Sequence, residues 1–297
     1  MITISMQDIY DAFIGSFRLQ AKLLKETCNV KSVEFLPKEK SALQLPTRLS
    51  GSLSKDACAC VVPLDYVIAP TVITTHSWDY FEIEFARKVI PPALSAFVLV
   101  DIGANVGLFS RQMLIAFETI KVVFCYEPDS DNFGYLTRNL QAFNNVNKHN
   151  YGLGSCDGAL EFFRDWSNSG NYSLNKAAMP RDDKFDNINV EVRAAKSVCV
   201  DWLSLDLPIF YKSDTQGHDE IIATAADPKI WPSVFAGIFE LWRIAKPEYS
   251  VEAFRAILDQ FPNKMFLQEP GRMLTTDDVI NFLQGRDDVF RDLGFWK

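Results

Sequence analysis

Short apolar runs alternate with stretches of helical hydrophobic spacing from residue 78 onward, and this alternation limits the possible folds. Strands are expected at 97–100, 122–126, 148–153, 159–163, 190–194, 208–213, 234–240 and 264–268. Helices are expected over 78–89, 108–119, 131–143, 217–226, 250–260 and 276–285. Repeated strand–helix units predict an α/β fold, with a mostly parallel sheet covered by helices on both faces. Ligands bind such sheets at the carboxyl ends of the strands.

The first 75 residues do not continue this alternation. Residues 6–26 carry apolar side chains at approximately helical spacing, which predicts a helix docked on the domain or on a second subunit. Scattered Pro, Gly, Ser and Lys predict irregular structure over 32–60, whereas 61–68 and 71–75 resemble short strands. We therefore divide the chain into an N-terminal extension, 1–75, and an α/β domain, 76–297. The extension is the candidate contact for a homo-oligomer.

The composition is that of a foldable, acidic chain. Lys and Arg total 30 against 38 Asp and Glu, so the formal net charge is −8, and 48% of the residues are hydrophobic. Disorder is excluded, and no nucleic-acid partner is expected because phosphate binding needs a concentrated basic surface. No apolar run approaches the ~18 residues of a membrane helix, and the N-terminus lacks a signal-peptide pattern. We expect no membrane span and a cytoplasmic location.

The cysteines are consistent with a reducing compartment. Cys125 and Cys199 fall in strand-like apolar runs, where buried reduced thiols are expected. Cys58 and Cys60 form a tight pair, but they have neither the spacing of a zinc site nor a matching second pair.

The densest signal is the segment Asp-Ile-Gly-Ala-Asn-Val-Gly, from Asp101 to Gly107, which follows an expected strand. Gly103 and Gly107 allow a sharp turn and a close approach of the backbone to a ligand. The next helix offers free N–H groups at its N-terminus. A dinucleotide site would have Gly-x-Gly-x-x-Gly here. Asp101 instead suits a ligand with a cationic end.

The following strand ends at Glu127, 26 residues after Asp101. An acid at this place can accept two hydrogen bonds from a ribose diol, as in dinucleotide-binding folds. S-adenosylmethionine satisfies both features, with its ammonium near Asp101 and its ribose at Glu127.

Four segments, in this order, resemble the FkbM family of S-adenosylmethionine-dependent methyltransferases: DIGANVGLFS, EPDSDNFGYLTRNL, CVDWL and YKSDTQGHDE. The resemblance covers roughly residues 78–245. It implies a class I methyltransferase (Rossmann-like) fold, with a seven-stranded, mostly parallel sheet and a reversed final hairpin. It also implies O-methylation of a sugar or natural-product hydroxyl as the usual reaction.

The resemblance also implies residue roles. The methionine end of the cofactor would be lined by Asp101, Gly103, Ala104, Asn105 and Gly107. Glu127 would hold the ribose. The adenine would be flanked by Pro128, Asp129, Gly152 and Leu153.

The chain departs from the family after the expected strand at 208–213. The family commonly has Lys-Ile-Asp-x-x-Gly-Ala-Glu there, whereas this chain has His218 in place of Ala and Asp219 in place of Glu. Residues 1–75 also lie outside the resemblance.

Three residues are candidates for catalysis, because methyl transfer to an alcohol needs alignment of the partners and usually a base for the hydroxyl proton. Asp214 is the first choice for contact with the acceptor or cofactor, with helix capping as its alternative role. His218 has a pKa suited to a general base, although it is also consistent with a surface residue on a first helical turn. Glu240 ends an apolar strand and is either an acceptor-site acid or a partner of Lys212 or Arg243.

Other side chains are candidates for an acceptor pocket or a metal site. The acceptor-pocket candidates are Trp166, Asn171, Tyr172 and Trp242. Asp214, His218 and Asp219 together lack an identified fourth ligand for a divalent metal, so no metal site is assigned.

We therefore expect an S-adenosylmethionine-dependent O-methyltransferase whose acceptor is a small-molecule or glycan hydroxyl. A non-catalytic binding or assembly protein of the same fold is an alternative, motivated by the altered residues His218 and Asp219 and by the N-terminal extension. A nucleic-acid methyltransferase is a further alternative. The net charge and the lack of an Asn-Pro-Pro-Tyr-type tetrapeptide count against it.

Overall fold

A computed structural model of the chain describes residues 32–35, 60–63, 65, 67–75, 77–180, 184–245, 248–285 and 287–297. The helix expected over 6–26 and the cysteine at position 58 lie outside these residues.

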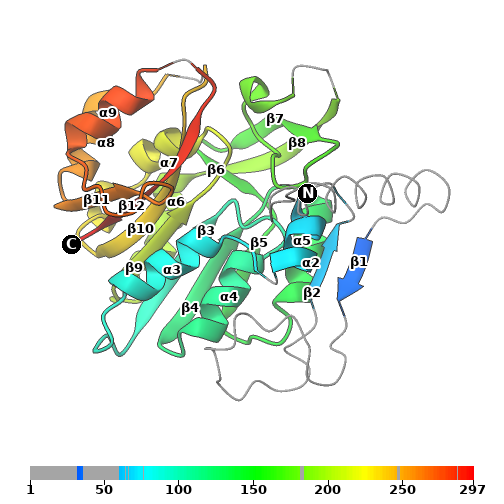
Figure 1. Cartoon of the computed structure of the whole chain (residues 1–297), viewed down its shortest axis with the longest axis horizontal. Helices are drawn as coiled ribbons and strands as arrows, with labels where there is room; N and C mark the ends of the chain where they lie inside the picture. Colours follow the sequence, from blue (N-terminus) through cyan, green and yellow to red (C-terminus); the bar gives the residue numbers. More distant parts are fainter. Residues whose placement is uncertain are drawn as a thin grey trace, which may run out of the picture.

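A seven-stranded sheet forms the centre of the molecule (Figure 1). Its strands are, in spatial order, β11 (Asn263–Phe266), β12 (Phe290–Trp296), β10 (Val234–Trp242), β9 (Ile209–Ser213), β3 (Phe97–Ile102), β4 (Ile120–Tyr126) and β5 (Val146–His149). β12 runs antiparallel to both of its neighbours, and the other pairs are parallel. This order and the reversed β12 confirm the expected class I methyltransferase fold.

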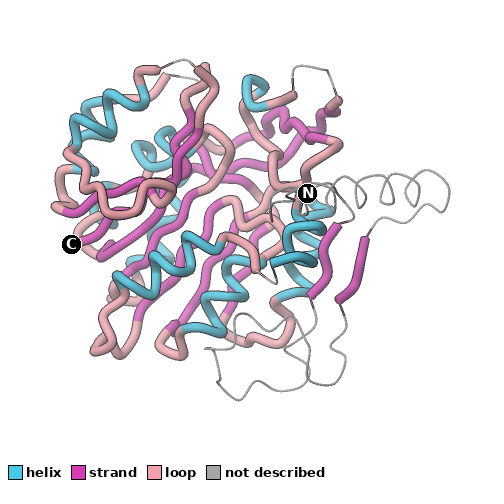
Figure 2. The backbone as a smooth tube through the Cα atoms, viewed as in Figure 1, coloured by secondary structure: helices cyan, strands magenta, loops and turns pink. Residues whose placement is uncertain are grey.

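Helices cover both faces of the sheet, as Figure 2 shows. The helices are α3 (Tyr80–Val89), α4 (Leu108–Ala116), α5 (Ser130–Asn139), α6 (Ala195–Leu203), α7 (Asp219–Ala225), α8 (Val251–Leu258) and α9 (Thr276–Leu283). Because side chains alternate along a strand, Val98 and Val100 of β3 pack with α6 and α7. Phe97 and Leu99 pack on the other face with α3 and α4. The buried β3 is thus enclosed on both sides, which explains its continuous apolar run.

A three-stranded sheet lies beside the main one, in the order β6 (Gly152–Gly154), β8 (Phe185–Ala194) and β7 (Gly158–Asp165). The β7 and β8 strands are at the upper right of Figure 1. After β7 the chain runs through a loop, 166–175, and a short 3₁₀ helix, Lys176–Ala178. This loop contributes to the cavity described below.

The N-terminal part that is described consists of the antiparallel strands β1 (Ser32–Phe35) and β2 (Cys60–Pro63), followed by α2 (Ile68–Thr75). The strand predicted over 71–75 is therefore wrong. Ile68 and Val72 lie one helical turn apart, and both are buried in a cluster with Val106 and Leu108. This packing outweighs the strand preference of the Thr- and Val-rich segment.

The other expected elements occur close to their predicted positions, with the following differences. β1 lies in the segment 32–60, which was expected to be irregular, and the strand expected over 61–68 is limited to β2. The strand expected near 148–153 is divided between β5 and β6. Cys199 is a buried thiol, as expected, but it lies in α6 and not in a strand. No element was predicted over α6 or β12. Within the described parts of the chain, no helix has the length and apolar character needed to cross a membrane.

Candidate active site

The carboxyl ends of β3, β4, β9 and β10 border a cavity of about 450 Å³. Nine of the predicted site residues line it: Gly103, Ala104, Asn105, Glu127, Pro128, Gly152, Leu153, Asp214 and Glu240. The first seven follow β3 and β4 or lie in β6, and we call this the loop end of the cavity. Asp214 follows β9, which is the neighbour of β3, and Glu240 lies in β10, one strand farther along the sheet. The structure therefore brings the cofactor and acceptor candidates into one space.

The loop from Gly103 to Gly107 is held close to its neighbours. The N–H groups of Gly103 and Ala104 both donate to the carbonyl of Tyr126 at 3.0 Å. Gly103 has a φ of 75°, and a Cβ there would overlap the carbonyl oxygen of Asp214. Gly107 has a φ of 78°, and a Cβ there would lie 3.2 Å from the Leu136 side chain. Both positions therefore require glycine, and the backbone between them lines the cavity.

Glu127 is fixed by the same loop. Its Oε2 accepts from the backbone N–H of Asn105 at 2.9 Å, and its Oε1 accepts from that of Asp129 at 2.8 Å. The residue is only 4% exposed, and burial raises the pKa of its carboxyl to about 8. Each carboxylate oxygen can accept more than one hydrogen bond, so the group can still receive donors from the cavity.

Asp101 lies outside the set of described residues that line the cavity. It is fully buried, and its Oδ2 accepts from Ser110 Oγ at 2.6 Å. Its Oδ1 lies 3.8 Å from Lys212 Nζ. Burial raises the pKa of Asp101, and the Lys212 charge opposes this rise. The cation that the structure places next to Asp101 is therefore Lys212.

Asp129 and Gly107 also lie outside the described cavity lining. Asp129 Oδ1 accepts from the N–H groups of Asp131 and Asn132, both at 2.9 Å, and so caps α5. Its Oδ2 accepts from Arg164 Nε at 2.6 Å. Both oxygens of this carboxylate thus accept hydrogen bonds from the protein, one at the start of α5 and the other from β7.

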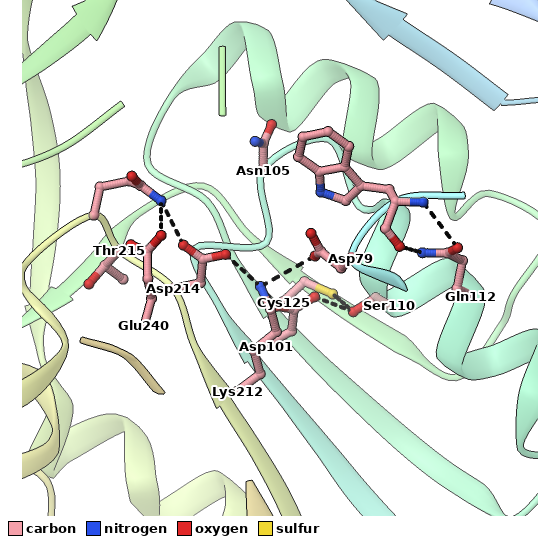
Figure 3. Close-up of polar contacts among 12 residues, drawn as sticks. Asp79, Asp101, Asn105, Ser110, Gln112, Cys125, Lys212, Asp214, Thr215 and Glu240 are labelled. Atoms are coloured by element: carbon pink, nitrogen blue, oxygen red, sulfur yellow. Dashed lines mark hydrogen bonds and ion pairs between the residues drawn. The ribbon is translucent and has the colours of Figure 1, made fainter. Parts of the chain in front are cut away.

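On the side of the cavity formed by β9 and β10, Gln216 joins the two candidate acids Asp214 and Glu240, and both acids are labelled in Figure 3. Its Nε2 donates to Asp214 Oδ1 at 2.8 Å and to Glu240 Oε1 at 3.0 Å. Asp214 Oδ2 also accepts from Lys212 Nζ at 3.1 Å. Figure 3 shows Lys212 between Asp214 and Asp79. Asp214 therefore serves this network and does not cap α7.

Glu240 pairs with neither of the cations predicted as its alternative partners. Arg243 is paired with Asp287, at 2.7 Å, and the described ion pairs of Lys212 do not include Glu240. Burial raises the pKa of Glu240 well above its ordinary value, and nearby carboxylates such as Asp214 raise it further.

His218 is buried and precedes the first residue of α7, outside the described lining of the cavity. Its neighbour Asp219 is fully buried and accepts from Ser213 Oγ at 2.5 Å and from the Thr215 N–H at 3.1 Å. Burial raises the pKa of Asp219 to about 7. Asp219, which stands where the family commonly has Glu, therefore stabilises the turn between β9 and α7.

Four further residues line the cavity and were not predicted from the sequence: Asp79, Glu82, Gln216 and Asp292. Gln216 was present in the quoted motif, and its left-handed φ of 55° gives it a special position in the turn. Of the pocket candidates, Asn171, Tyr172 and Trp242 line the cavity. Trp166 is 58% exposed and lies outside its described lining.

The chain matches no protein-family model and no curated protein. Among solved structures it is similar to the methyltransferase FkbM from Methylobacillus flagellatus KT, with 16% identity and a TM-score of 0.40. That match covers 76% of this chain and 53% of the other, so the chain spans about half the length of that protein. Geranyl diphosphate C-methyltransferase from Streptomyces coelicolor A3(2) matches at 10% identity and a TM-score of 0.36, covering 97% and 95% of the two chains. Precorrin-6y C5,15-methyltransferase from Geobacter metallireducens GS-15 matches at 12% identity and a TM-score of 0.31, covering 73% and 88%.

Proposed function

We propose that this chain is an S-adenosylmethionine-dependent methyltransferase of the FkbM type that methylates a hydroxyl of a small molecule or sugar unit. The observation that carries the proposal is the shared cavity. The Gly103 loop and Glu127 line one end, and Asp214 and Glu240 line another part of the same space.

The residues at the loop end fit this cofactor. Asn105 lines the cavity, and its Oδ1 accepts no hydrogen bond from a described residue. Glu127 accepts hydrogen bonds from the ribose diol, and Pro128 and Leu153 supply apolar contacts for the adenine. When bound, the cofactor supplies a methyl group on a sulfonium. The protein has to position the acceptor and remove its proton.

We assign Asp214 as the base that removes the proton from the hydroxyl of the methyl acceptor. Its side chain is 28% exposed and lines the cavity, so a hydroxyl can reach it. Lys212 and Gln216 fix its two oxygens, which orients the carboxylate. A positioned base typically contributes ~10²–10⁴-fold to a rate.

The cofactor assignment is tested by calorimetric titration of the protein with S-adenosylhomocysteine. We expect saturable binding to the parent chain. Glu127→Ala should weaken it about tenfold or more, because hydrogen bonds to a charged group typically contribute ~1.5–3 kcal/mol. Glu161→Ala is the matched control, because Glu161 is exposed on β7 and outside the described cavity lining. Absence of binding to the parent would reject the proposed function.

The base assignment is tested by measuring S-adenosylhomocysteine release with a panel of hydroxylated acceptors. Asp214→Asn should lower turnover by at least ~10²-fold while cofactor affinity stays near that of the parent. His218→Ala should have a smaller effect because His218 lies outside the described lining. An equal or larger loss in His218→Ala would transfer the role of base to His218. Cofactor binding without transfer to any acceptor would favour the non-catalytic alternative.

A further inference from the structure

Carboxyl groups crowd the part of the cavity beside β9, β10 and β12. This acidic end consists of Asp79, Glu82, Asp214, Glu240 and Asp292. Glu240 and Asp292 lie directly opposite each other on β10 and β12. Lys212 is the one Lys or Arg among the described residues that line the cavity. The acidic end therefore has more carboxyl groups than cations to pair with them.

Lys212 neutralises only part of this charge. Its Nζ lies 3.1 Å from Asp214, 3.8 Å from Asp79 and 3.8 Å from Asp101, so three acids share one ammonium. The remaining acids, Glu82, Glu240 and Asp292, form no ion pair within the described part of the chain.

Glu240 provides an independent indication of a ligand. It is 6% exposed and lines the cavity, and its Oε1 accepts from Gln216. Its Oε2 accepts no hydrogen bond from any described residue. A buried acceptor without a donor is unfavourable, and such atoms in native proteins normally have a partner. Because Glu240 is one of the residues that line the cavity, a ligand bound there would lie next to this carboxyl group.

Burial raises the pKa of Asp79 to about 7 and that of Asp292 to about 6. For Glu82 and Glu240 it raises the pKa well above the ordinary value. Near neutral pH this end therefore holds protons. A cation favours the ionised carboxylates, so its binding is coupled to proton release.

Two aromatic side chains favour an organic cation over a metal ion. Trp242 and Phe290 line the same region, with ring centroids 6.1 Å apart in an edge-to-face arrangement. Such faces attract alkylammonium groups. Among the residues that the structure describes, no three His, Cys, Asp or Glu side chains are arranged to hold a metal ion.

The acidic end is also distinct from the loop end. β10 and β12 lie two and three strands from β3 in the sheet order, which corresponds to about 10 and 14 Å at the usual strand spacing. Glu240 and Asp292 are therefore separated from the loop that we assign to the methionine part of the cofactor.

We propose that the acidic end binds the protonated amine of the methyl acceptor, which is then an amino alcohol or an amino sugar. This inference rests on the proposed function, because it assigns the hydroxyl of the same molecule to Asp214, the member of the acidic end whose backbone lies against Gly103. Glu240 Oε2 and Asp292 accept from the ammonium, and Trp242 and Phe290 contact its carbon chain.

The test is calorimetry of the full chain, with and without saturating S-adenosylhomocysteine, using aminopentanol and the matched neutral pentanediol. The amine should bind at least tenfold more tightly than the diol. Titration in two buffers of different ionisation enthalpy should show proton release. Glu240→Gln and Asp292→Asn should each weaken amine binding at least threefold. The exposed controls Glu161→Gln and Asp186→Asn should leave it unchanged, and thermal unfolding verifies that each variant is folded.

Equal affinity for amine and diol, or no binding of either, would overturn the inference. Saturable binding of Mg²⁺ or Mn²⁺ that displaces the amine and is lost in Glu240→Gln would also overturn it, in favour of a metal site. If S-adenosylhomocysteine binds and the amine does not, the inference alone fails. If the amine binds selectively and S-adenosylhomocysteine does not, the cation site is supported and the methyltransferase function fails.

Discussion

At the scale of single residues, Glu127 shows how burial and hydrogen bonding act in opposite directions on one carboxyl. The backbone N–H groups of Asp129 and Asn105 favour its ionised form, yet burial dominates and raises its pKa to about 8. A ribose diol would donate hydrogen bonds to the ionised carboxylate. Binding of a ribose should therefore be linked to loss of the Glu127 proton.

This linkage predicts how cofactor affinity depends on pH. Because binding favours the deprotonated form, affinity for S-adenosylhomocysteine should increase as the pH rises toward 8, by at most about tenfold per unit, and level off above it. Glu127→Gln should bind more weakly, with a flatter profile over the same range. Calorimetry between pH 6 and pH 9 measures both curves. Parallel curves for parent and variant would show that another group controls the dependence.

At the scale of elements, much of the main sheet was predictable from sequence. β3, β4, β9 and β10 are continuous apolar runs because both of their faces are covered, and such runs are visible without any structural information. The glycine loop and Glu127 follow two of these strands, so this part of the loop end could be located from spacing, whereas Pro128, Gly152 and Leu153 were assigned from the family resemblance. In contrast, α2 was misassigned because tertiary packing overrides a local preference.

The acidic end could not be predicted in the same way. Asp292 lies on β12, which reverses direction and inserts between β10 and β11, and no local pattern encodes this pairing. Asp79 and Glu82 belong to the segment before β3, far in sequence from β12. Long-range pairing of this kind depends on the whole fold. Glu240 was found because it ends an apolar strand.

The side chain of Asp129 is expected to stabilise the start of α5. Asp129→Ala removes the cap of α5 and leaves Arg164 without its closest carboxylate, so the free energy of unfolding should fall by about 1–2 kcal/mol. Asp131→Ala is the matched control in the same turn, where the carboxylate is exposed and 3.5 Å from Arg164. It should have a clearly smaller effect. Urea unfolding measures both.

A second variant at this position tests its predicted contact with adenine. Asp129→Asn retains an oxygen that can cap the helix. If the role of Asp129 is confined to α5, this variant should bind S-adenosylhomocysteine like the parent. A loss of tenfold or more with an intact fold would support the adenine contact that the family resemblance implies.

At the scale of the whole molecule, the net charge of −8 includes carboxyl groups that the fold buries. Burial raises the pKa of Asp219 and Asp79 to about 7 and that of Glu127 to about 8. The native chain therefore binds more protons than the unfolded chain between the ordinary carboxyl pKa and these values. The interior acids link the stability of the entire domain to pH.

The buried carboxyl groups determine how the stability of the domain changes with pH. A carboxyl whose pKa is raised by folding stabilises the native state below its unfolded pKa, and this stabilisation is lost as the pH rises through the folded pKa. The free energy of unfolding should therefore decrease from pH 5 to pH 8, with each such group contributing at most ~1.4 kcal/mol per unit. Asp219→Asn retains an Oδ1 for Ser213 and Thr215 but cannot ionise, so its slope between pH 5 and pH 7 should be shallower. The exposed Asp186→Asn should keep the parental slope, and urea unfolding at each pH compares the three proteins. An unchanged slope in Asp219→Asn would show that Asp219 is already ionised in the native protein, and the buried acids at the cavity would then have to account for any remaining dependence.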